Sequence, residues 1–101
     1  MYIPKHFEET RLPVLYEMMR ANPLATLITL DQNQFNANHI PMVLDAEAGI
    51  LRAHIARANA LWKSYDQHIG CMAIFQGPMS YISPSYYPGK LDSDNVLPTW
   101  N

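Results

Sequence analysis

The segment from Arg52 to Lys63 carries the residue types best suited to bind an anionic group. An expected strand runs directly into a short expected helix here, and Arg57, Asn59 and Lys63 gather around the helix start. A helix start offers free backbone N–H groups and a partial positive charge, which favour a phosphate. Arg57 would add a forked donor and Lys63 a mobile charge one turn later. The pattern predicts a phosphate site, although a solvated helix start capped by Asn59 fits the same residues.

Polar side chains in two otherwise apolar strands form a second group of candidates. Asn38 and His39 lie in a strand where unsatisfied polar groups would be costly, so they contact a polar ligand or face water at a sheet edge. The alternation of this strand places Asn38 on one face with Ile40 and His39 on the other. Gln76 ends an apolar strand, where its amide either reads the edge of a flat heterocycle or belongs to an ordinary turn.

Other common site chemistries find no support in the sequence. The four histidines form no HxxxH or HxH pair, and Cys71 has no second thiol, so a zinc site is not expected. The serines after Met79 lack a glycine elbow and an evident base. With four glycines there is no phosphate loop and no GxGxxG turn. The sequence therefore identifies no catalytic residue and no metal site.

Composition limits the classes of protein further. The chain has 101 residues, of which 49% are hydrophobic and 16% charged, as expected for one globular domain. Seven Lys and Arg against nine Asp and Glu give a net charge of -2, which disfavours direct binding to nucleic acid. No apolar run is long enough to cross a bilayer, and the first residues contain no signal core. The single cysteine favours a reducing compartment, and the cytoplasm is predicted.

Hydrophobic patterning predicts a mainly β domain with small helices. Strands are expected near 24–30, 35–44, 50–56 and 69–82, and helices near 12–21 and 59–65. Pro41 predicts that its strand lies at an edge or beside a bulge. The run Ile69–Phe75 is apolar on both faces and is predicted to be a central strand. Antiparallel strands with short turns indicate a small β-barrel or half of one, and so thin a core favours a partner subunit.

Several motifs, in order along the chain, resemble the PaiB family of FMN-binding negative transcriptional regulators, the protease synthase and sporulation regulators. The matching stretches are Met1-Tyr-Ile-Pro-Lys-His-Phe7, Pro23-Leu-Ala-Thr-Leu27, Ala37-Asn-His-Ile-Pro41, His54-Ile-Ala-Arg-Ala-Asn59, Ala73-Ile-Phe-Gln-Gly-Pro78, Tyr81-Ile-Ser-Pro-Ser85 and Pro98-Thr-Trp-Asn101. The resemblance implies an FMN-binding split β-barrel like those of pyridoxamine-phosphate oxidase and the flavin reductases. Residues 1–101 would be a single domain, the N-terminal part of that barrel, in a homodimer that holds FMN at the subunit interface.

The resemblance also implies a set of cofactor-binding residues and a function. The expected cofactor-binding residues are Asn38, His39, His54, Arg57, Asn59, Lys63 and Gln76. The expected function is that of an FMN-binding negative regulator of transcription; neither expected helix is basic, which argues against direct contact with DNA. Two alternatives remain: a flavin-dependent oxidoreductase acting on an unknown small substrate, and a half-barrel that carries no ligand.

Overall fold

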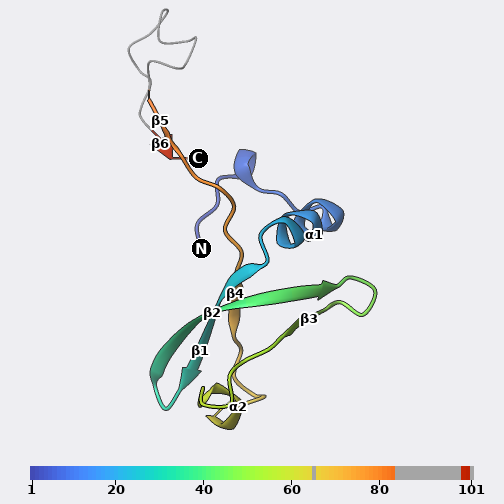
Figure 1. Ribbon diagram of the computed structural model, residues 1–101. Helices are drawn as coiled ribbons and strands as arrows, with labels where there is room; N and C mark the ends of the chain where they lie inside the picture. Colours follow the sequence, from blue (N-terminus) through green and yellow to red (C-terminus); the bar gives the residue numbers. More distant parts are fainter. Residues whose placement is uncertain (65, 84–98, 101) are drawn as a thin grey trace, which may run out of the picture.

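The protein is mainly antiparallel β-sheet with short helices, in a computed structural model that describes residues 1–64, 66–83 and 99–100 (Figure 1). The elements are, in order, η1 (Lys5–Phe7), α1 (Leu12–Ala21), β1 (Leu24–Asp31), β2 (Gln34–Asp45), β3 (Ile50–Ala53), α2 (Leu61–Ser64), β4 (Met72–Ile74), β5 (Tyr81–Ile82) and β6 (Thr99–Trp100). Four strands form one sheet in the order β3-β2-β1-β4, and β5 pairs with β6 separately. The predicted mainly β class is confirmed, and this arrangement fits a split-barrel-like fold.

Helix α1 has the predicted bounds because local residues fix both of its ends. Pro13 lies in the first turn, where a missing N–H leaves no hydrogen bond unmade. At the other end, the N–H of Asn22 bonds to the carbonyl of Met18, and Pro23 prevents a further turn. Arg11 occupies the N-cap position without a side-chain capping bond. The helix therefore has one proline in its first turn and ends two residues before another.

Strands β1 and β2 form a hairpin around a two-residue turn. Gln32 and Asn33 have φ angles of 49° and 62°, both in the left-handed region that a tight hairpin turn requires. Pairing then runs from Asp31 opposite Gln34 to Leu24 opposite Pro41. This register fixes which side chains share a face of the sheet.

Strand β2 changes partner in its middle, at Pro41. Pairing with β1 ends at Pro41, and pairing with β3 begins at Met42. The strand as a whole has a neighbour on each side, but Pro41 pairs only with Leu24 of β1, so the proline occupies a locally unpaired edge as expected. Strand β3 stops at Ala53, short of the predicted 56, and α2 is shorter than the predicted 59–65.

The prediction that Ile69–Phe75 forms a central strand is wrong in the described part of the chain. Strand β4 covers only Met72–Ile74, pairs with β1 alone and lies at the edge of the sheet. The segment after it does not continue in the same sheet, because β5 pairs with β6 instead. Gln76-Gly77-Pro78 separates the two strands, and Pro78 has no N–H to offer a ladder.

The two faces of the four-stranded sheet differ in burial. One face, called here the core face, carries the buried residues Ala25, Ile40 and Met42. Half-buried side chains pack against these three: Leu27, Ile55, Leu61, Ala73 and Phe75. The opposite face, called the open face, presents exposed apolar side chains: Leu24, Phe35, Val43, Met72 and Ile74. The core is thus as thin as predicted.

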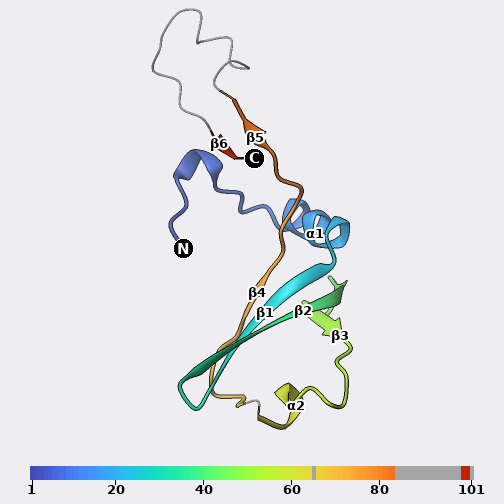
Figure 2. The same cartoon turned by 60° about the vertical axis from the view of Figure 1, so that its left-hand side comes forward.

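Helices α1 and α2 lie at opposite ends of this sheet, and β5 continues beyond the α1 end (Figure 2). The Cα radius of gyration is 18.3 Å, whereas a compact domain of this length has about 13 Å. No helix in the described residues is long and apolar enough to cross a membrane. The chain is thus more extended than a closed domain of its size.

Candidate functional site

Asn59 joins the start of α2 to the core face of the sheet. Its Oδ1 accepts a hydrogen bond from the backbone N–H of Leu61 at 3.0 Å, so it caps the helix as the sequence predicted. Its Nδ2 donates to Oδ1 of Asn38 on β2, also at 3.0 Å. Both residues are half-buried. Asn59 therefore caps the helix and also contacts the sheet, which leaves one of its amide hydrogens free for a ligand.

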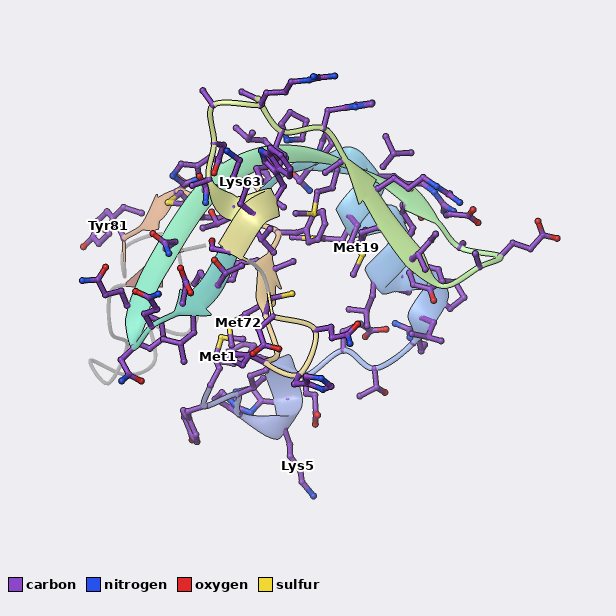
Figure 3. The ribbon with its side chains drawn as sticks, turned by 90° about the horizontal axis from the view of Figure 1, so that it is seen from below. Met1, Lys5, Met19, Lys63, Met72 and Tyr81 are labelled. Carbon is purple, nitrogen blue, oxygen red and sulfur yellow. The ribbon has the colours of Figure 1, made fainter. Side chains whose placement is uncertain are left out.

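Trp62 contacts the backbone of Arg57 and lies beside the side chain of Lys63. The indole Nε1 of Trp62 donates to the carbonyl of Arg57 at 3.0 Å, and Nζ of Lys63 lies 5.2 Å from the centre of the Trp62 ring. Figure 3 looks from the α2 end, with Lys63 in front of the strands. Both cations are exposed, and neither pairs with a carboxylate of the described residues. The segment therefore presents two exposed positive charges that an anionic ligand could contact.

His39 and Gln76 lie together at a second place, on the open face. They line a hollow of about 390 Å³ with Thr26, Asn22, Leu24 and Ile74. Nδ1 of His39 is 3.1 Å from Oγ1 of Thr26, its cross-strand partner, and the tautomer decides which atom donates. Nε2 of Gln76 approaches Sδ of Met79 at 3.7 Å. This hollow offers an imidazole and an amide at the edge of an apolar surface.

The predicted site residues thus fall into two groups on opposite faces. Asn38 pairs with Leu27 on the core face, while the adjacent His39 pairs with Thr26 on the open face, as strand alternation requires. His54 is exposed between β3 and α2 and does not line the hollow of His39 and Gln76. Within one chain, therefore, the predicted site residues lie on two sides of the sheet. Asn38, Arg57, Asn59 and Lys63 belong to the core-face side, and His39 and Gln76 belong to the open face.

Sequence reasoning missed two residues that hold these groups in place. Thr26 contacts His39, and this pair could have been found, because a two-residue turn at 32–33 dictates the cross-strand register. Trp62 reaches back five residues to the carbonyl of Arg57. No periodicity predicts that contact, because it depends on how the chain bends before α2.

A second hollow, of about 480 Å³, lies between β1 and α2 and is lined mainly by apolar side chains such as Leu27, Leu61 and Ile69. Asp31 and Asp66 contribute carboxylates, and no Lys or Arg among residues 1–64 and 66–83 lines it. Free Cys71 is exposed at this hollow. An anion would meet like charge here, so the hollow does not suit a phosphate.

A twisted antiparallel sheet with polar hollows and available cations is a scaffold for a bound organic cofactor. The whole chain, residues 1–101, matches the family model described as "Putative FMN-binding domain". The chain belongs to this FMN-binding domain family, and its cofactor is FMN.

Curated relatives come from bacteria and fungi. The chain is 32% identical over 103 residues to "Protease synthase and sporulation protein PAI 2" of Bacillus subtilis, covering 100% of this chain and 47% of that protein. It is 34% identical over 122 residues to "Uncharacterized protein YKL070W" of Saccharomyces cerevisiae, covering 100% of this chain and 72% of the yeast protein. The chain thus spans about half the length of the bacterial relative, and the resemblance to the PaiB family is confirmed.

Proposed function

We propose that this chain is a PaiB-type regulatory protein that binds FMN as a homodimer, with the FMN phosphate held by Arg57, Asn59 and Lys63. A phosphate carries two negative charges and needs converging donors. The observation that carries the proposal is that Arg57 and Lys63, on either side of the Asn59 cap, are both exposed and neither is neutralised by a described carboxylate. The chemistry of this donor set fits the phosphate of FMN.

The isoalloxazine ring, we propose, contacts the open-face hollow, where Gln76 and His39 face its polar edge. The amide of Gln76 can donate and accept hydrogen bonds at once, which suits the alternating donors and acceptors along the polar edge of a flavin ring. Arg57 and Lys63 lie on the core-face side of the sheet, opposite this hollow. The ring and the phosphate of one FMN are therefore contacted by different copies of the chain. Asn38 acts through Asn59, and His54, which is exposed between β3 and α2, would approach the cofactor in the dimer.

Exposed apolar side chains on the open face support the homodimer. Phe35 is 79% exposed and Val43 70% exposed, in the same face as Leu24, Met72 and Ile74. Soluble monomers rarely present so many large apolar side chains together on one surface. The tyrosines of segment 81–87 are a further expected contributor to this interface; Tyr81 is exposed, and Tyr86 and Tyr87 lie outside the described residues.

Regulation of transcription, in this proposal, is indirect. Helix α1 holds one acidic and one basic side chain, Glu17 and Arg20, and α2 has four residues, so neither resembles a basic recognition helix. A net charge of -2 also opposes binding to DNA. The regulatory partner is thus a protein or a small-molecule signal. The exposed free thiol of Cys71 fits the reducing cytoplasm.

Titration of FMN and riboflavin, followed by flavin fluorescence, tests the phosphate site. Arg57→Ala should weaken FMN binding by about 1.5–3 kcal/mol, the contribution of a charge-assisted hydrogen bond, and riboflavin binding little. Lys63→Ala should cost less, because its flexible ammonium loses more freedom per contact. Arg52→Ala is the matched control, since this exposed arginine pairs with Asp45 instead. Equal affinity of Arg57→Ala and wild type for FMN would exclude this segment from the site.

A further inference from the structure

A hollow of about 290 Å³ on the core face has a lining rich in carboxamides. It lies between the β1–β2 hairpin and the start of α2. Its polar side chains come from both elements: Asp31, Gln34, Asn36, Asn38, Asn59 and Ser64. We call these six residues the amide hollow. None of the described Lys or Arg residues lines it, so it differs in chemistry from the adjacent cations of Arg57 and Lys63.

Much of the hydrogen-bonding capacity of the amide hollow is unused by the described residues. The bond from Asn59 occupies Oδ1 of Asn38 and leaves the Nδ2 donors of Asn38 free. Asn36 is exposed, and no hydrogen bond to its amide is found within residues 1–64 and 66–83. The lining therefore holds both donors and acceptors that remain available.

These groups select the class of ligand. An apolar ligand would bury the amides without partners, which is unfavourable. An anion would meet the carboxylate of Asp31 without a compensating cation in the lining. A hydroxyl group donates and accepts at the same time, as an amide does, so several hydroxyls in a row match several amides. The lining therefore suits a neutral polyhydroxylated chain.

We infer that the amide hollow binds a polyol chain, and specifically the ribityl chain of the flavin. The inference rests on the proposed phosphate site, with which the hollow shares Asn59. The polyol of FMN is attached directly to its phosphate, so a polyol site must adjoin a phosphate site. A free sugar alcohol offers the same chemistry, and the experiment separates these two sources.

Three flavins of decreasing length test the assignment with the full chain: FMN, riboflavin, and lumiflavin, which has neither phosphate nor polyol. Asn36→Ala should weaken FMN and riboflavin by the same factor, about three- to tenfold for one neutral hydrogen bond, and leave lumiflavin unchanged. Gln34→Ala serves as a second variant. Gln67→Ala is the control, because this exposed amide lines the apolar hollow instead. An equal loss for lumiflavin, or no loss for riboflavin, would overturn the inference.

Free ribitol provides the second arm. Suppose that millimolar ribitol raises the melting temperature of wild type but not of Asn36→Ala, and that Asn36→Ala binds all three flavins as wild type does. The hollow then binds a separate polyol, and the flavin assignment is wrong. The outcome is distinguishable from failure of the phosphate site. That failure appears as an unchanged FMN-to-riboflavin ratio in Arg57→Ala, whereas this inference concerns the riboflavin-to-lumiflavin ratio in Asn36→Ala.

Discussion

Nδ2 of Asn59 donates to Oδ1 of Asn38 at 3.0 Å and so connects the start of α2 to the middle of β2, 21 residues earlier. The other end of the same amide accepts from the N–H of Leu61. One side chain thus sets the position of a four-residue helix that is too short to be stable alone. The cations at 57 and 63 flank it, so their separation depends on this contact.

Loss of this amide should destabilise the fold measurably. Asn59→Ala removes a helix cap, worth about 1 kcal/mol, and a neutral hydrogen bond of similar size, so we expect a loss of about 1–2 kcal/mol in urea unfolding. Asn59→Ser keeps a cap and should recover about half. In a double-mutant cycle, Asn38→Ala and Asn59→Ala should couple by at least about 0.5 kcal/mol. Strict additivity would mean that the contact contributes nothing to stability.

Trp62 should matter for the phosphate and not for the rest of the cofactor. Trp62→Phe keeps an aromatic ring for Lys63 and removes the indole N–H that holds the Arg57 carbonyl. We expect FMN affinity to fall about three- to tenfold, the effect of one hydrogen bond, with riboflavin affinity unchanged. Trp62→Ala should cost more because it removes the ring as well. Fluorescence titration with both flavins measures the difference, and a matching loss for riboflavin would contradict the role.

Charge on the β2–β3 turn should make stability depend on pH in the acid range. Nη1 of Arg52 donates to Oδ2 of Asp45 at 2.6 Å, and this bond is the main reason that the pKa of Asp45 lies below its usual 3.8. A lowered pKa in the folded state stabilises the fold above pH 3.8, and the stabilisation disappears as pH falls through the folded-state value.

Asp45→Asn tests this pH dependence because it keeps an acceptor for the Ala48 N–H and loses the charge. At neutral pH the variant should unfold at lower urea than wild type, and the two midpoints should converge once the carboxyl is protonated. Arg52→Gln should behave like Asp45→Asn. A gap that persists unchanged at pH 2 would show that the ion pair is not its cause.

Local sequence determined what could be predicted. Helix α1 was correct because Pro13 and Asn22-Pro23 act on their own neighbours, and the β1–β2 hairpin was correct because alternation and a turn are also local. The edge position of β4 was missed, since apolar residues on both faces do not reveal how many strands pair with it.

In the candidate site, too, local features could be predicted from the sequence and long-range contacts could not. Alternation placed Asn38 and His39 on opposite faces, and the register confirms it. The contacts of Asn59 with Asn38 and of Trp62 with Arg57 depend on how the chain bends between β3 and α2. No spacing in the sequence encodes that bend, so the residues of the cation group could be identified from sequence but the side chains that hold them could not.

A charge introduced on the open face should both dissociate the proposed dimer and weaken FMN binding. Val43 is 70% exposed and pairs with Arg52 at the edge of the sheet, so Val43→Lys adds no buried charge to a single chain. In a dimer that covers this face, the lysine would lose its water without gaining a partner. Light scattering at tens of micromolar should find wild type as a dimer and Val43→Lys as a monomer. FMN affinity should fall as well, because the ring contacts come from the second copy. The free energy of urea unfolding of the monomer should stay within about 0.5 kcal/mol of wild type, as is usual for surface changes.

Phe7→Lys is the matched control, since Phe7 is 73% exposed in η1, outside the sheet. A wild type that is monomeric at these concentrations, or a Val43→Lys variant that remains dimeric, would contradict a homodimer formed through the open face.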